Sequence, residues 1–166
     1  MAASVDDVCV KLAAAALQDR CSNNKGLDTT SQVTKFHSAR VPSITMPDYF
    51  KRIAKYSHCS AECHIIALIY IDRHIRTREV SITFRNVHRL VIVAVMVAAK
   101  LRDDVYYSNA YYASIGGVSN REINELEVEL LNSVSWETYV SFEEYHAYFE
   151  ALQRRFSSLV GDAPSA

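Results

Sequence analysis

The sequence places two cysteines and two histidines close together in residues 58–64 (HCSAECH), just ahead of a long apolar stretch. Cysteine thiolates and neutral imidazoles are the ligands that zinc prefers. A zinc finger also needs a second Cys or His pair at a suitable spacing, and no such pair follows Cys63 and His64. Free cysteine is, besides, among the most buried residue types. We therefore predict that this cluster binds no metal and that its cysteines are buried at the start of a helix.

An enzyme that uses His58, Cys59, Cys63 or His64 is the alternative interpretation of the same cluster. Nucleophilic, phosphoryl-transfer and acid–base enzymes place their reacting groups in recognisable patterns. The chain has no Ser-His-Asp order, no phosphate loop and no paired-carboxylate motif. We therefore expect no catalytic residues and no cofactor, and predict that the protein is not an enzyme.

Composition and charge narrow the class of protein further. A chain of 166 residues, 49% of them hydrophobic, suits one globular domain. A net charge of −1 without a Lys/Arg stripe argues against nucleic acid or an anionic membrane as a partner. The longest strongly apolar run, residues 90–99, is about half as long as a bilayer requires. Acids, not bases, precede the first apolar stretch, so we expect no secretory signal and a cytoplasmic or nuclear protein with reduced thiols.

Helix start signals recur along the chain, whereas strand-like alternation is scarce. Polar residues that typically cap helix N-termini precede most apolar stretches. The expected caps are Ser4, Thr45, Ser60, Asn86, Ser119 and Ser141, the last two within capping boxes. The predicted helices are residues 4–18, a helix that begins at Thr45, 61–76, 87–102, 106–115, and two that follow Ser119 and Ser141. These signals predict an all-α protein.

Two of these helices, residues 61–76 and 87–102, are apolar nearly all round, which places them at the centre of a bundle. Gly116 and Gly117 are expected to close the short helix before them with a left-handed cap. Residues 21–43 are polar and mixed and are interpreted as a linker, and the tail from residue 157 is expected to fray.

A family resemblance is carried by six segments that follow one another in a consistent order and spacing. They are residues 49–53 (YFKRI), 86–90 (NVHRL), 95–100 (VMVAAK), 106–113 (YYSNAYYA), 115–119 (IGGVS) and 122–127 (EINELE). Residues 44–140 resemble a cyclin box, a five-helix domain that binds and activates a protein kinase. The similarity is greatest to the P-type, or U-type, cyclins, the group that includes the yeast phosphate-pathway cyclin. The resemblance implies a single box at 44–140, an N-terminal helix and linker at 1–43, and a C-terminal helix and tail at 141–166.

The resemblance also implies a kinase-binding site. In the family, a lysine that ends the third box helix and a glutamate in the fifth bond backbone groups of the kinase near its movable regulatory helix. Lys100 and Glu127 occupy those positions, and Leu101, Leu131 and Trp136 fall at or beside the same surface. A core role explains Leu131 and Trp136 equally well. From the residues alone, Lys100 could instead cap helix carbonyls while Glu127 pairs with a cation of the same chain.

The leading hypothesis is a regulatory subunit that binds and activates a cyclin-dependent Ser/Thr protein kinase. The alternative is a nucleic-acid-binding or scaffold protein of transcription with the same fold, as in general transcription factor IIB. We expect no Arg-x-Leu substrate docking, because residues 46–49 (MPDY) stand near where the Met-Arg-x-Ile-Leu patch of cell-cycle cyclins belongs. The tyrosines at 106, 107, 111 and 112 suit either a core edge or an interface. The N-terminal helix is expected to pack outside a box that folds without residues 1–40.

Overall fold

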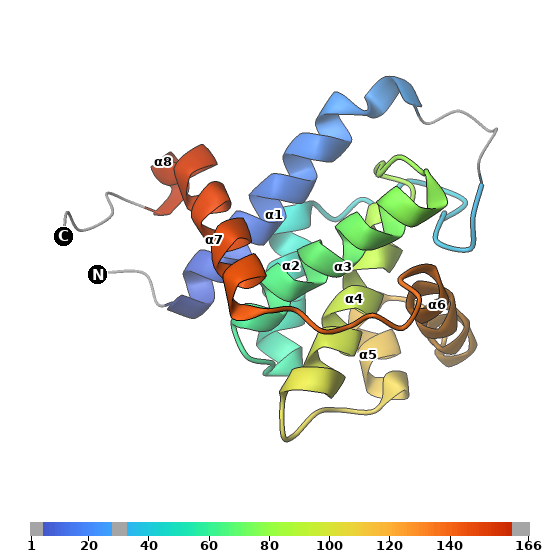
Figure 1. Cartoon of the computed structure of the whole chain (residues 1–166). Coiled ribbons are helices and arrows are strands. Elements are labelled where there is room, and N and C mark those ends of the chain that lie inside the picture. The colour runs from blue at the N-terminus through green and yellow to red at the C-terminus, as the bar shows by residue number, and fades with distance from the viewer. Residues whose placement is uncertain (1–4, 28–32, 161–166) are drawn as a thin grey trace.

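Helices make up all the regular structure in the residues that the computed structural model describes, 5–27 and 33–160 (Figure 1). They are α1 (Val5–Asn23), the short 3-10 helix η1 (Lys25–Leu27), α2 (Met46–Ser57), α3 (Glu62–Arg78), α4 (Val87–Arg102), α5 (Asn109–Gly116), α6 (Asn120–Ser133), α7 (Phe142–Arg155) and α8 (Ser157–Val160). The predicted all-α class is confirmed. The predicted cap Ser4 lies outside the described residues, as does the tail after residue 160, whereas residues 157–160 form a helix rather than a frayed end.

The two helices predicted to be central do form the centre of the bundle. In α3 every residue of 63–71 is buried, and in α4 only Arg89 interrupts a buried run over residues 87–99. A helix that is apolar all round can be stable in water only when other helices cover it on every side. The remaining helices supply that cover: α1 and α7 pack on α3, α2 and α5 pack on α4, and α6 packs on both.

Thr45, Ser119 and Ser141 cap their helices as predicted, each accepting a hydrogen bond from a backbone N–H in the first turn. Only the box at Ser119 is complete, because the Glu122 carboxylate returns to the Ser119 N–H at 2.8 Å. The box predicted at Ser141 is half formed. Glu144 instead places its carboxylate on Arg73, a stronger partner than a backbone N–H.

Two residues expected to cap helices make no side-chain capping bond, and one helix begins later than predicted. Ser60 does not cap α3 and instead donates its hydroxyl and its N–H to the Asp103 carboxylate. Helix α4 begins at residue 87 as predicted, directly after Asn86, but the Asn86 side chain does not cap it. That side chain accepts from the Thr83 N–H and donates to the Ser81 carbonyl, both at 2.9 Å. The short helix begins at residue 109 rather than 106, because the Ser108 hydroxyl accepts from a first-turn N–H.

The end of α5 is held in place by α2 and α4. The Tyr49 hydroxyl donates to the Gly116 carbonyl and Arg52 Nε donates to the Ile115 carbonyl, both at 2.8 Å. The left-handed residue is Gly117 alone, at φ 76°, whereas Gly116 is the last helical residue. A Cβ on Gly116 would lie 2.4 Å from Cγ1 of Ile92, so this glycine is required for close contact between α5 and α4.

Replacing Gly116 with alanine is therefore expected to destabilise the fold. The added methyl group must displace Ile92 or shift α5, and such overpacking typically costs about 1–3 kcal/mol of unfolding free energy. Urea denaturation of Gly116→Ala measures the loss. Gly26→Ala is the matched control, because a Cβ there meets nothing within 4 Å. Equal stability of the two variants would contradict the close α5–α4 contact.

Helix α1 is longer than predicted and more deeply built into the core. It continues to residue 23, five residues past the expected end, and contacts α2, α3, α7 and α8. Its buried hydrophobic residues are Cys9, Val10, Leu12, Ala13, Ala14, Leu17 and Cys21. The segment after it is more than a polar linker, because the Phe36 ring is buried edge-on against His74 with centroids 4.9 Å apart. The structure thus gives the N-terminal segment a role in the core that the sequence analysis did not expect.

Candidate functional site

A small polar cluster formed by Lys100, Asn109 and Glu127 joins the end of α4, the start of α5 and the middle of α6. The Lys100 ammonium, in the last turn of α4, donates to Glu127 Oε2 in α6 at 2.7 Å and to Asn109 Oδ1 at 2.9 Å. The Asn109 amide, at the start of α5, donates to Glu127 Oε1 at 3.2 Å and to Asn124 Oδ1 at 2.9 Å. We call Lys100, Asn109 and Glu127 the polar triad.

Both charged members of the polar triad are partly exposed and keep unused hydrogen-bonding capacity. The Lys100 side chain is 29% exposed and that of Glu127 is 18% exposed. An ammonium has three donors and a carboxylate about four acceptor sites, and the triad occupies two of each. The within-chain alternative is half right: Glu127 does pair with a cation of its own chain, but that cation is Lys100, which contacts side chains rather than helix carbonyls. A backbone carbonyl and N–H of another protein can still be bound.

Exposed apolar side chains are close to members of the polar triad in the sequence. Leu101 follows Lys100 directly and is 55% exposed, and Val128 next to Glu127 is 52% exposed. Val105, Tyr106 and Tyr107 are also exposed, in the segment between α4 and α5. Clusters of exposed apolar residues around a polar centre are typical of protein-binding surfaces. We call the polar triad with these five residues the α4–α6 face.

The four tyrosines divide between core and surface. Tyr112 is fully buried, whereas Tyr106 and Tyr107 are exposed. Tyr111 lies between the two groups: its ring stacks on that of Tyr107 with centroids 4.1 Å apart, and its hydroxyl donates to the Tyr56 carbonyl at 2.8 Å. Tyr112 is therefore a core residue, whereas an interface role for the exposed Tyr106 and Tyr107 stays a prediction.

Trp136 lies in the connection between α6 and α7 and is 62% exposed, which rules out a core role for it in this chain. It and Ser135 both have left-handed backbones, at φ 59° and 57°, an uncommon conformation outside glycine. The indole N–H donates to Asn132 at 3.0 Å. Leu131 differs, because it is half-buried and packs against the core.

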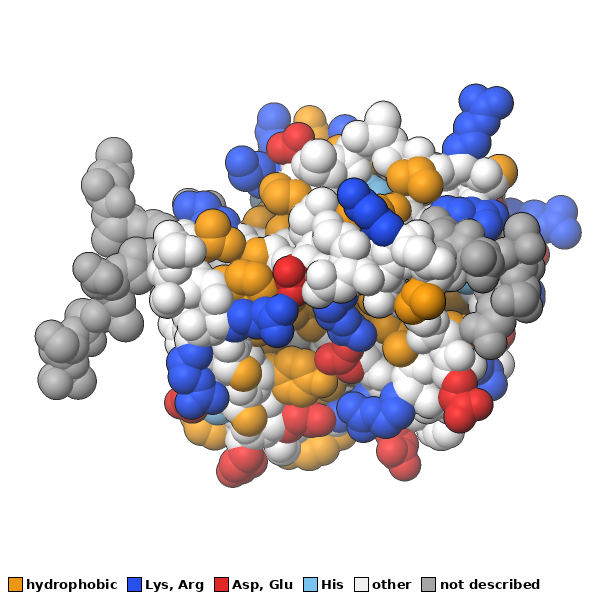
Figure 2. All heavy atoms as spheres, turned by 90° about the horizontal axis from the view of Figure 1, so that it is seen from above, with side chains coloured by type: hydrophobic (Ala, Val, Ile, Leu, Met, Phe, Trp, Pro, Cys, Tyr) orange, Lys and Arg blue, Asp and Glu red, His pale blue; other side chains and the backbone are white. Residues whose placement is uncertain are grey.

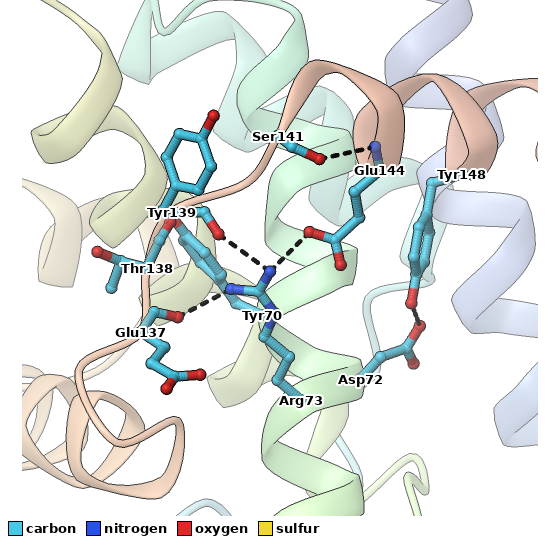
Figure 3. Close-up of polar contacts among 9 residues, drawn as sticks. All are labelled: Tyr70, Asp72, Arg73, Glu137, Thr138, Tyr139, Ser141, Glu144 and Tyr148. Carbon is cyan, nitrogen blue, oxygen red and sulfur yellow. Dashed lines mark hydrogen bonds and ion pairs between the residues drawn. The ribbon is translucent and has the colours of Figure 1, made fainter.

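Arg73 of α3 fixes the connection that carries Trp136, as Figure 3 shows. Its guanidinium donates to the carbonyls of Glu137 and Tyr139 at 2.8 and 3.0 Å and pairs with Glu144 at 2.7 Å. The Tyr70 hydroxyl, also from α3, donates to the Thr138 carbonyl between them at 2.9 Å. The exposed indole is thus presented by a connection that is anchored to the central helix.

Comparison with known proteins identifies the family. A model of the family described as Cyclin matches residues 2–138. Cyclin-U4-1 of Arabidopsis thaliana is 44% identical over 131 residues, which cover 78% of this chain and 65% of that protein. Cyclin-P3-1 of Oryza sativa subsp. japonica is 40% identical over 147 residues, which cover 89% of this chain and 61% of that protein. The chain is a P-type, or U-type, cyclin.

This cyclin spans less than two thirds of the length of those two relatives. The family match begins at residue 2 and so includes α1, in line with the burial of that helix. The boundaries at residues 43 and 140 stay predictions, as does the assignment of Lys100, Glu127, Leu101, Leu131 and Trp136 to a kinase-binding site. No helix within the described ranges is both long and apolar enough to cross a bilayer.

Sequence reasoning missed the role of Asn109 in this cyclin. The residue lies inside the segment 106–113 that carried the resemblance, but nothing in its local pattern indicated a partner. The usable signal was Ser108, because a serine cap there starts the helix at residue 109 and sets the asparagine in its first turn. The pairing of Asn109 with side chains 9 and 18 positions away needs the tertiary structure.

The Cys/His cluster of this cyclin is only partly as predicted. Cys63 is buried, but Cys59 is half-buried and His58 is exposed. Asp103, at the end of α4, joins the cluster from a distant part of the sequence, with its Oδ2 3.8 Å from Cys63 Sγ. Across residues 5–27 and 33–160 no three His, Cys, Asp or Glu side chains are grouped so as to hold a metal ion. That the protein needs no metal stays a prediction.

Proposed function

We propose that this cyclin binds a cyclin-dependent Ser/Thr protein kinase through the α4–α6 face and activates it. Membership of the cyclin family supports a regulatory role, and the names of the relatives assign them to the same group. The observation that carries the placement is the polar triad, which keeps one donor and about two acceptor sites unused at a junction of three helices whose adjoining residues include exposed apolar side chains.

Activation would follow from differential binding. A kinase is active only when its regulatory helix and activation segment are correctly placed. A subunit that binds this arrangement more tightly than the inactive one shifts the kinase population toward it, by no more than the difference in binding free energy. Lys100 and Glu127 would bond backbone groups beside the regulatory helix, and Leu101, Leu131 and Trp136 would lie at or beside the contact. The cyclin itself would contribute no group to phosphoryl transfer.

A nucleic-acid-binding or scaffold role in transcription is the second candidate. The face shown in Figure 2 disperses its Lys and Arg side chains among apolar and acidic ones rather than gathering them into a stripe. A net charge of −1 also provides little attraction for phosphates. We therefore favour the kinase, with action in the cytoplasm or nucleus.

Affinity capture from the native cell, followed by assay of the purified pair, tests the proposal. We expect a cyclin-dependent kinase to be recovered with the cyclin and its phosphotransfer to rise when purified cyclin is added back. Each cyclin-dependent kinase of that cell is then assayed alone and with cyclin. Absence of binding to all of them, together with a salt-dependent shift of DNA, would favour the second candidate instead.

A further inference from the structure

Two cysteines meet where α2 passes into α3, outside the α4–α6 face. Cys59 is half-buried and lies in the non-helical residues 58–60, and Cys63 is fully buried in the first turn of α3. Both are reduced in the structure, and they lie four positions apart in the sequence, on either side of the start of α3. The Cys63 thiol donates to Asp103 Oδ2, 3.8 Å from its sulfur, and also interacts with the Cys59 sulfur.

His64 completes the environment of the Cys59 sulfur. Its Nε2 lies 3.7 Å from Cys59 Sγ, and its buried Nδ1 has no hydrogen-bond partner. A proton on Nδ1 would leave a buried donor unsatisfied, which costs more than an unused acceptor lone pair. The neutral ring therefore carries its proton on Nε2 and donates it to Cys59. The imidazole thus supplies a hydrogen bond to the Cys59 sulfur, with which the Cys63 thiol also interacts.

The surroundings shift the pKa values of the two thiols in opposite directions. The hydrogen bond from Cys63, reinforced by His64, lowers the pKa of Cys59 far below that of an ordinary thiol. The N-terminus of α3 acts in the same direction, because a helix N-terminus favours negative charge. The interaction with Cys59, then burial and the nearby Asp103 charge, raise the pKa of Cys63. These shifts favour the thiolate form at Cys59 and the protonated thiol at Cys63.

We propose that Cys59 and Cys63 form a hydroperoxide-sensitive dithiol that closes to an intramolecular disulfide. The Cys59 thiolate attacks the terminal peroxide oxygen, the O–O bond breaks, and the departing oxygen takes a proton to give water or an alcohol. Cys63 sulfur then attacks the sulfenic acid sulfur of Cys59. The S–O bond breaks, the S–H proton of Cys63 leaves with the hydroxide as water, and the two sulfurs together lose the two electrons that reduce the peroxide.

Formation of the disulfide would change the structure of the α4–α6 face. This second step of the proposal rests on the proposed kinase-binding function. Asp103 caps the end of α4, three residues after Lys100, and holds the Ser60 N–H at 2.9 Å and the Ser60 hydroxyl. Closing the disulfide removes the Cys63 S–H that faces Asp103 and draws residues 59–60 toward α3. The hydrogen bonds between Asp103 and Ser60 are thereby altered, and the position of the last turn of α4 changes with them. Oxidation is expected to weaken kinase binding.

The chemical step is tested on the full chain without any kinase. After treatment with hydrogen peroxide and blocking of the remaining thiols, mass spectrometry should find the peptide that contains residues 59–63 lighter by two hydrogens. Cys63→Ser should instead accumulate a sulfenic acid at Cys59 that dimedone captures, and Cys59→Ser should form neither product. Cys21→Ser is the matched control, because Cys21 is buried in α1 and its loss should leave the disulfide unchanged.

Cys59 should react about tenfold faster than Cys21, since the thiolate is the reactive form. Oxidation of Cys21 at an equal rate, or four reduced thiols at a peroxide dose that oxidises free cysteine, would overturn the proposal. For the second step, the recovered kinase should bind oxidised cyclin more weakly, with recovery on addition of dithiothreitol and no effect of peroxide on Cys59→Ser. A disulfide that forms but leaves kinase binding unchanged would overturn the coupling while the kinase-binding proposal stands.

Discussion

A chain that lacks residues 1–24 is expected to lose cooperative unfolding. Helix α1 buries Leu12 and Leu17 completely against α2 and α3, along with five smaller residues. Full burial of a leucine side chain contributes about 1.5–3 kcal/mol, so these two alone account for roughly 3–6 kcal/mol. A domain of this size has a net stability of only about 5–15 kcal/mol. Truncation also exposes the apolar sides of the central helices, so thermal and urea unfolding should both become broad or vanish.

Single substitutions separate the packing of α1 from any effect of truncation itself. Leu17→Ala should lower the unfolding free energy by about 2–5 kcal/mol, because it leaves a cavity in the core. Lys11→Ala is the control on the same helix, since Lys11 is exposed and such a change usually costs within about 0.5 kcal/mol. A truncated chain that unfolds sharply, with a midpoint near that of the full chain, would restore the expectation that the box folds without residues 1–40.

Lys100→Ala and Glu127→Ala are each expected to weaken kinase binding by roughly 30-fold or more. Removing one member of a buried charged hydrogen bond at an interface costs about 2–5 kcal/mol, and about 1.4 kcal/mol corresponds to tenfold in affinity. In the free cyclin the pair is partly exposed, so breaking it should lower the unfolding free energy by about 1 kcal/mol or less. Isothermal titration with the kinase and thermal unfolding of the free chain measure the two effects separately.

Glu143→Ala is the matched control for this pair, because Glu143 is an exposed acid on α7, outside the α4–α6 face. It should leave kinase affinity unchanged. The double variant should lose less affinity than the sum of the two single ones, since Lys100 and Glu127 share one network. If both single variants fold and bind the kinase as well as the unchanged chain, the binding surface lies elsewhere. If both unfold readily, the pair is structural.

The helices were predictable where burial alone decides them. The apolar runs in α3 and α4 permit only a central position, and the caps at Thr45 and Ser119 act within four residues. The absence of a side-chain capping bond at Ser60 and at Asn86 has the same cause. Each side chain has a stronger or closer partner, one of them Asp103, which lies 43 residues away in the sequence. The local pattern around Ser60 contains no information about so distant a partner, whereas the partners of Asn86 lie within five residues of it.

The candidate site was predictable only through the family resemblance. No periodicity or spacing connects Lys100 to Glu127, which are 27 residues apart, and the ion pair between them was not foreseen. The part played by Asn109 and the exposure of Trp136 also depend on tertiary structure. Burial of α1 was missed because its alanine-rich sequence has only a weak contrast between faces. Small side chains can be buried by close helix packing without a strong apolar stripe.

Hydrogen–deuterium exchange of the cyclin, with and without its kinase, tests the central claim most directly. Backbone amides in residues 103–107 lie between α4 and α5, and most lack the helical hydrogen bonds that slow exchange. If the α4–α6 face is the binding surface, kinase should slow amide exchange in residues 103–107 and at the start of α5. Exchange in α7 and α8 should be unchanged. Protection confined to α1, α7 and α8, with residues 103–107 exchanging as in the free chain, would contradict it.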